Sequence, residues 1–244
     1  MPNLIKALKK LGGKRVWSVV VVAAGSARRM QGIDKILAHI GGVPILVRTL
    51  QVFQDNESIS QIVIVTREDL VGTIEDLCKA NGLDKVSAVV VGGAERVDSV
   101  RAGLQAVRSD AQLIAIHDGA RPFLTQRVLN EVLRQAAQSG AAAPAIPVND
   151  TVKRVDDRSV VCKTVDRSSL RAVQTPQVFQ GDLIRAAIEK AVADHAAVTD
   201  DCSAVERIGM SVVLTEGDRE NIKVTTPFDM VLAESIIAMR EERK

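Results

Sequence analysis

The feature that most constrains the fold of this chain is the alternation of short apolar runs with segments whose apolar residues recur at helical spacing. Residues 16–23 are predicted as a strand, and Val19–Val22 within it is continuously apolar, as in strands buried on both faces of a sheet. Further strands are expected at residues 61–66, 88–91, 113–117 and 212–215. Helices are expected from Pro44, at residues 68–80, 97–107, 126–138 and 181–194, and from Pro227.

This alternation predicts an α/β fold of the Rossmann-like kind, a mostly parallel, twisted sheet with helices on both faces. Such sheets bind ligands in the crevice outside the carboxyl ends of their strands. Polar clusters that directly follow the predicted strands are therefore the candidate sites.

Three regions of the chain are distinguished by composition. Residues 1–15 form a basic N-terminal extension with five Lys or Arg residues, and residues 16–244 are long enough for a single domain with a sizeable core. Within that domain, residues 149–170 interleave charged with β-branched residues around a turn at residues 156–158. This segment is predicted to be a projecting β-hairpin arm. Because a lone hairpin is marginally stable in water, we expect it to pack against something else, such as a second subunit.

Bulk properties exclude several classes of function. The net charge is +2 with acids and bases mixed, which disfavours nucleic acid as a partner. The longest apolar run, residues 19–24, is too short to span a bilayer, and residues 1–15 resemble neither a signal peptide nor an anchor. The three cysteines lack metal-ligand spacing and are expected to be reduced thiols. A cytoplasmic protein without a membrane partner is expected.

The first polar cluster, residues 23–30, follows the first strand and is joined by Lys35. Small residues there allow a ligand to approach backbone N–H groups, and Arg29 and Lys35 supply charge for a polyphosphate. A plain strand–helix turn with surface cations explains the local sequence equally well. With Gly25 alone, the dinucleotide fingerprint is not met, and residues 12–15 do not fit a P-loop, which disfavours a dinucleotide oxidoreductase.

Two more clusters follow later strands. Gly92 and Gly93 precede Ser99, so a base or ribose is able to rest on the backbone and form a hydrogen bond with the Ser99 hydroxyl, although a helix cap alone is the simpler interpretation.

The other cluster is His117–Pro122. The carboxylate of Asp118 is a candidate to help hold a hydrated divalent metal, and Arg121 is a candidate to bind an anionic substrate. His117 is interpreted as structural.

Taken together, the clusters carry a family resemblance. The segments A-A-G-x-x-x-R-M (23–30), G-G-x-x-R-x-x-S-V (92–100), H-D-x-A-R-P (117–122), V-D-R (165–167), Q-T-P-Q (174–177) and N-I-K-V-T (221–225) follow one another in the chain. In this order the chain resembles the 2-C-methyl-D-erythritol 4-phosphate cytidylyltransferases of the non-mevalonate isoprenoid pathway, from about Ser18 to Glu234.

The resemblance implies substrates and roles. CMP would pass from CTP to 2-C-methyl-D-erythritol 4-phosphate, with Mg²⁺, forming 4-diphosphocytidyl-2-C-methyl-D-erythritol and pyrophosphate. The residues implied to contact CTP are Ala23, Ala24, Gly25, Gly92 and Ser99. The catalytic cations implied around the reacting phosphates are Arg29, Lys35 and Lys223, with Asp118 near the magnesium.

The resemblance also implies a homodimer that the hairpin arm crosses. Thr151 and Arg167 would then reach the acceptor phosphate in the partner subunit's site. The attacking phosphate oxygen is already anionic, so no general base is needed and catalysis consists of positioning and charge neutralisation.

Two alternatives remain open at this point. A ribitol 5-phosphate cytidylyltransferase would share the CTP half of the site, although the segment 165–170 is typical of the methylerythritol type. A non-catalytic nucleotide-binding module is the other, because family members usually have Pro-Lys-Gln-Tyr where this chain has Asp34-Lys35-Ile36-Leu37.

Overall fold

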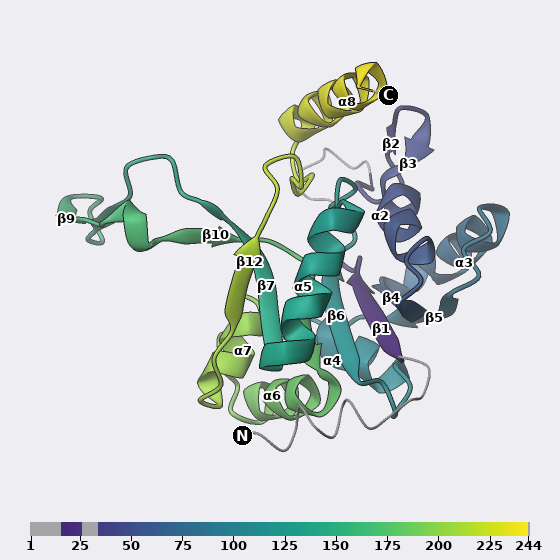
Figure 1. The fold of residues 1–244 in the computed structure, drawn as a ribbon, viewed down its shortest axis with the longest axis horizontal. Coiled ribbons are helices and arrows are strands. Elements are labelled where there is room, and N and C mark those ends of the chain that lie inside the picture. The colour runs from purple at the N-terminus through teal and green to yellow at the C-terminus, as the bar shows by residue number, and fades with distance from the viewer. Residues whose placement is uncertain (1–15, 26–33, 244) are drawn as a thin grey trace.

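The computed structural model describes residues 16–25 and 34–243 of the chain, and an eight-stranded sheet forms its centre (Figure 1). Strand β1 (Trp17–Val22) lies between β4 (Ile59–Thr66) and β6 (Leu113–Asp118) and is parallel to both. Strand β5 (Val86–Val91) continues the parallel part beyond β4. Trp17 to Val21 are all buried, which confirms the prediction of a central strand covered on both faces.

The other half of the sheet is mixed. Next to β6 the order continues β11 (Gln177–Gln180), β7 (Ala141–Pro147) and β10 (Arg171–Val173), each antiparallel to its neighbour. Strand β12 (Val213–Glu216) pairs with β7 in parallel. The predicted α/β class, with a mostly parallel sheet, is confirmed.

Helices cover both faces of this sheet, as predicted. One apolar core packs α2 (Ile45–Gln54), α3 (Val71–Ala80) and α5 (Gln126–Ser139) against one face. A second core packs α4 (Arg96–Ala106), α6 (Gly181–Ala193) and α7 (Asp201–Arg207) against the other. A short 3₁₀ turn, η2 (Glu68–Leu70), precedes α3, so the helix predicted at residues 68–80 is in two parts.

A third, smaller core lies beyond the carboxyl ends of the central strands. Here α8 (Pro227–Glu242) packs Ala233, Ile236 and Ile237 against Ile40 and Phe123. Ile40 belongs to the small hairpin of β2 (His39–Ile40) and β3 (Val43–Pro44). Of the helices in residues 16–25 and 34–243, none has the length and apolar character that a membrane span requires.

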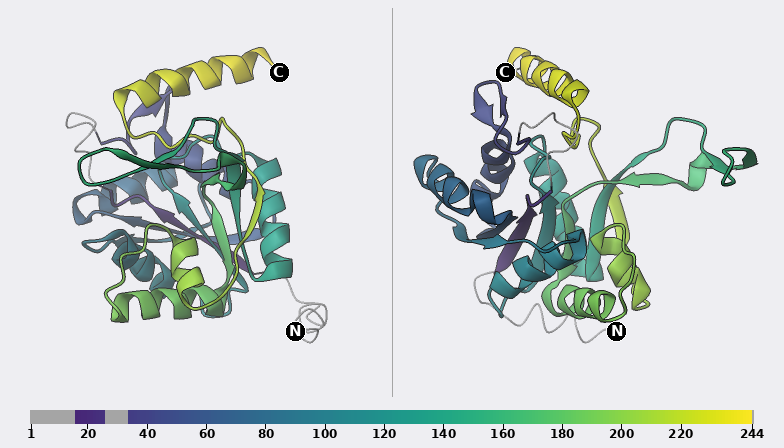
Figure 2. Two further views of the ribbon diagram at one scale, coloured as in Figure 1. Left: turned by 90° about the vertical axis from the view of Figure 1, so that its left-hand side faces the viewer. Right: turned by 180° about the vertical axis from the view of Figure 1, so that it is seen from behind.

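The predicted arm is present as a two-stranded antiparallel hairpin of β8 (Lys153–Val155) and β9 (Val161–Thr164), followed by the 3₁₀ turn η3 (Arg167–Ser169). It projects from the body of the molecule, and Figure 2 shows the same projection from behind. Every residue of β8 and β9 is exposed in the single chain.

Candidate active site

The loops that leave β1 and β6 are fastened side by side at the carboxyl edge of the sheet. The Ala23 N–H donates to the Val65 carbonyl at 2.7 Å, and the Gly119 N–H donates to the Val22 carbonyl at 2.9 Å. Each loop therefore begins with a hydrogen bond to the carboxyl end of a neighbouring strand. This is the edge at which α/β sheets bind ligands.

The glycine loop after β5 lies against the loop after β1. A Cβ at Gly92 would lie 2.7 Å from Ser99 Oγ and 2.8 Å from the Ala24 Cβ, so only glycine allows this approach. Ser99 is buried, and its hydroxyl accepts from the Gly93 N–H and donates to the Glu95 carbonyl, both at 3.2 Å. In this structure the Ser99 hydroxyl holds the glycine loop in place.

Lys35 lies at the end of the loop after β1, since its Nζ is 3.5 Å from where a Cβ at Gly25 would stand. Its neighbour Asp34, the departure from the family pattern, pairs with Arg67 at 2.7 Å and accepts from the Ile36 N–H at 3.2 Å. The Asp34 carboxylate thus has its own counter-ion. Arg29, the other cation predicted here, lies outside the described residues.

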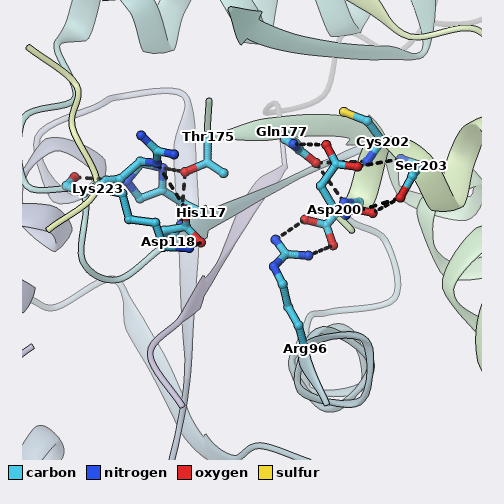
Figure 3. A network of polar contacts seen from close by, with 11 residues as sticks. Arg96, His117, Asp118, Thr175, Gln177, Asp200, Cys202, Ser203 and Lys223 are labelled. Carbon is cyan, nitrogen blue, oxygen red and sulfur yellow. Dashed lines mark hydrogen bonds and ion pairs between the residues drawn. The ribbon is translucent and has the colours of Figure 1, made fainter. Parts of the chain in front are cut away.

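Asp118, at the end of β6, is a buried carboxylate between two cations (Figure 3). Its Oδ1 is 3.0 Å from Lys223 Nζ, and its Oδ2 accepts from Arg121 Nε at 3.1 Å. Burial alone would raise the pKa of Asp118, but Lys223 and Arg121 outweigh it and lower the pKa to about 2. The structure therefore brings together Asp118, Arg121 and Lys223, although Lys223 lies more than a hundred positions after Asp118 in the sequence.

His117 lies behind this cluster and has no exposed surface. Its Nδ1 is 3.0 Å from the Thr175 hydroxyl, which also accepts from the Asp118 N–H at 3.2 Å, and its Nε2 is 3.3 Å from the Arg121 carbonyl. Burial lowers the pKa of His117 to about 4, so the ring is neutral at pH 7. These contacts agree with the structural interpretation of His117.

A second network, also drawn in Figure 3, was missed by the sequence reasoning. Gln177 accepts from the backbone N–H groups of Asp201 and Cys202 at 2.9 and 3.0 Å, and donates to Asp200 at 2.8 Å. Arg96, the first residue of α4, donates to both carboxylate oxygens of Asp201 at 2.8 and 2.6 Å. This ion pair joins the helix that follows the glycine loop to α7. Arg96 stands in the G-G-x-x-R motif, but its partner is 105 residues away and carried no local signal.

Thr151 and Arg167 lie in the arm segment and are exposed. The Arg167 guanidinium donates to the Asn149 carbonyl. The arm segment in which they lie extends away from the sheet in the single subunit (Figure 1).

The described residues offer few ligands for a metal. In residues 16–25 and 34–243, no group of three or more His, Cys, Asp and Glu side chains is placed to hold an ion. Asp118 is a single carboxylate, and each of its oxygens already contacts one cation. A carboxylate has about four lone-pair sites, so room for a further contact remains.

Comparison with known proteins adds the family. A family model described as 2-C-methyl-D-erythritol 4-phosphate cytidylyltransferase matches residues 17–239. The protein of that name from Geobacillus thermodenitrificans is 47% identical over 225 residues, covering 92% of this chain and 98% of the relative. The one from Symbiobacterium thermophilum is 46% identical, covering 90% and 92%.

Solved structures agree with these sequence relatives. The crystal structure of 4-diphosphocytidyl-2C-methyl-D-erythritol synthase from Anaerococcus prevotii matches with a TM-score of 0.82 at 31% identity, covering 93% of this chain and 98% of that one. The Thermus thermophilus 2-C-methyl-D-erythritol 4-phosphate cytidylyltransferase matches with a TM-score of 0.73 at 32% identity, covering 90% and 98%. The chain belongs to the 2-C-methyl-D-erythritol 4-phosphate cytidylyltransferase family.

Proposed function

We propose that the protein transfers CMP from CTP to 2-C-methyl-D-erythritol 4-phosphate, releasing pyrophosphate and forming 4-diphosphocytidyl-2-C-methyl-D-erythritol for isoprenoid precursor synthesis. The observation that carries the proposal is the cluster of Lys223, Asp118 and Arg121 at the end of β6, in a chain of this family. A buried, ionised carboxylate that holds a partly exposed lysine suits a site where anions must meet.

The reaction requires charge neutralisation more than proton transfer. An acceptor phosphate oxygen attacks the α-phosphorus of CTP, a new P–O bond forms, and the bond to the pyrophosphate oxygen breaks. The main obstacle is repulsion between two anions. Lys223 and Lys35, with Arg29 as the resemblance implies, would hold the reacting phosphates in line and offset their charge.

The nucleotide would rest on the two loops of small residues. Ala23, Ala24 and Gly25 follow β1, and Gly92 packs against Ala24. Backbone without bulky side chains lets a flat base or a ribose come close. Arg121 remains a candidate to contact an anionic substrate, although its guanidinium already donates to Asp118 and to the Asn221 carbonyl.

Magnesium is proposed to enter with CTP. Mg²⁺ sites usually combine one or two carboxylates with substrate phosphates and water, and Asp118 is the carboxylate present for this role. When bound, the ion would neutralise charge on the leaving pyrophosphate.

The arm is proposed to complete the site of a second subunit in a homodimer. Residues 16–244 would form one nucleotidyltransferase domain, with 149–170 as its dimerisation arm. The exposed Thr151 and Arg167 support this arrangement, because they lie on a segment that leaves its own subunit. They would bind the acceptor phosphate across the interface.

The test is pyrophosphate release from CTP and Mg²⁺, with 2-C-methyl-D-erythritol 4-phosphate and ribitol 5-phosphate offered separately. Turnover with the first alone is expected, and Lys223→Ala should lower kcat at least about a hundredfold, as for loss of a transition-state charge contact. Turnover with ribitol 5-phosphate alone would overturn the acceptor. Near-normal kcat in folded Lys223→Ala would overturn the role of the lysine.

A further inference from the structure

The loop that carries Lys223 has no regular secondary structure of its own. Residues 217–224 lie between β12 and α8, outside helix and strand, and the Lys223 side chain is 41% exposed. A loop of this kind places a side chain accurately only if neighbouring elements fix its backbone. The contacts that hold this loop are therefore relevant to where the lysine ammonium stands.

At the far end of the loop the Val224 N–H donates to the Ala120 carbonyl at 2.8 Å, and near its start Gln174 provides the main side-chain contact. This buried side chain donates from Nε2 to the Asp218 carbonyl at 2.7 Å and accepts on Oε1 from the Asp218 N–H at 3.1 Å. One amide thus pairs with both polar groups of one residue, as a neighbouring strand does. Nε2 also reaches the Asn221 carbonyl at 3.4 Å, two residues before Lys223.

Gly217 leaves the space that this pairing needs. Its N–H donates to the Ala145 carbonyl of β7 at 2.9 Å. A Cβ at this position would lie 2.6 Å from Gln174 Oε1 and 3.1 Å from the Ala145 carbonyl oxygen. Any larger residue must displace either the glutamine amide or the loop from β7.

Gln174 also stands where the arm returns to the sheet. It directly follows β10, whose residues pair with β7, and its N–H donates to the Pro144 carbonyl at 2.8 Å. The backbone of Gln174 therefore belongs to the sheet and the base of the arm, while its side chain holds the Lys223 loop.

We propose that Gln174 is a positioning residue for the reaction: its amide fixes the backbone of residues 217–224 and so sets the reach of Lys223 toward the phosphates, and Gly217 is the residue that permits this. The inference rests on the proposed function. Gln174 contacts no reacting atom and acts through the lysine.

Two variants test the inference from opposite sides of the contact. Gln174→Met keeps the volume but removes both hydrogen bonds to Asp218, and Gly217→Ala keeps the amide but takes its space. Both should lower kcat about 10-fold to 100-fold, as for misplacement of a catalytic group by about 1 Å. The KM for CTP should change less than about threefold, because the loops after β1 and β5 are untouched.

Matched controls separate positioning from general destabilisation. Gln61→Met removes an amide that accepts from the Arg108 N–H at 3.1 Å and from the Ser18 hydroxyl at 3.0 Å, at the opposite end of the sheet. Gly72→Ala adds a Cβ that meets no heavy atom within 4 Å. Both controls should keep kcat within about twofold of the wild type.

The outcomes distinguish this inference from the proposed function. If the wild-type protein does not turn over CTP with either acceptor, the function itself fails. If the wild type is active and folded Gln174→Met or Gly217→Ala keeps its kcat within about twofold, the positioning role is wrong. An equal loss in Gln61→Met would likewise overturn it, because the effect would then be one of stability.

Discussion

At the scale of single residues, two consecutive residues at the end of β6 differ in charge: Asp118 is ionised and His117 is neutral. Asp118 is ionised because Lys223 and Arg121 contact its two oxygens. His117 is neutral because its full burial outweighs the neighbouring Asp118 carboxylate and the contact with the Arg121 carbonyl, which both favour the charged ring. One residue therefore presents charge to the site while the other supports the turn that carries it.

The neutral state of His117 predicts how stability depends on pH. Its pKa is about 4 in the folded protein, below the ordinary value of 6.5. Between these values the unfolded chain binds a proton that the folded protein does not, so stability falls as the pH falls through this window. We expect the free energy of unfolding to drop by about 2 kcal/mol more in the wild type than in His117→Asn between pH 7 and 5, measured by urea denaturation.

The exposed His39 serves as the control for this measurement. His39→Asn should keep the wild-type difference between the two pH values. Equal pH dependence in the wild type and His117→Asn would show that the buried ring does not control stability in this range.

At the scale of elements, the arm exposes apolar side chains that nothing in the single chain covers within the described residues. Val155, Val160 and Val161 are 50%, 57% and 55% exposed, although valine is a residue that strands usually bury. Burial of these side chains against a second subunit would explain why valines stand at positions that are exposed in the single chain. The same arrangement would bring Thr151 and Arg167 to the partner's site.

This arrangement predicts that charge on the arm separates the subunits. We expect the wild type to sediment as a dimer, and Val160→Lys with Val161→Lys to raise the dissociation constant at least about tenfold, since an unpaired ammonium would be buried. Turnover should fall in parallel if the arm carries acceptor contacts.

Met210→Lys changes an equally apolar side chain, 40% exposed, outside the arm and should leave the dimer intact. A wild type that is monomeric at micromolar concentration, yet active, would contradict the dimerisation role of the arm.

Most of the helices and strands could be predicted from the sequence. The strands with continuous valine and isoleucine and the helices with regular apolar spacing were placed within a few residues. Strand β7 was missed because its sequence, AAAPAIP, has little β propensity, and its pairing with β10, β11 and β12 in the folded sheet is what makes it a strand. The motifs identified the clusters after the strands, but the partners of Gln174 and Arg96 lie 44 and 105 residues away and depend on the folded sheet.

At the scale of the whole molecule, close packing between the helix and sheet layers stabilises the fold, whereas close packing at the carboxyl edge shapes the proposed nucleotide site. Glycine occurs in both places for the same steric reason. In α4, a Cβ at Gly103 would lie 2.4 Å from a methyl group of Val20 and 2.8 Å from one of Val65, in the core between helix and sheet. At the edge, a Cβ at Gly92 would instead push apart the two loops proposed to hold CTP.

The same substitution at these two glycines should therefore affect two different properties, stability at Gly103 and CTP binding at Gly92. Gly103→Ala is expected to lower the free energy of unfolding by about 1–3 kcal/mol, as overpacking does, with little change in the KM for CTP. Gly92→Ala is expected to raise the KM for CTP roughly tenfold, equivalent to about 1.4 kcal/mol of lost binding, with a smaller loss of stability. Denaturation curves and initial rates on both variants decide the matter. If Gly92→Ala binds CTP normally, the two loops do not form the nucleotide site, and the cations at the end of β6 would have to hold the nucleotide by its phosphates alone.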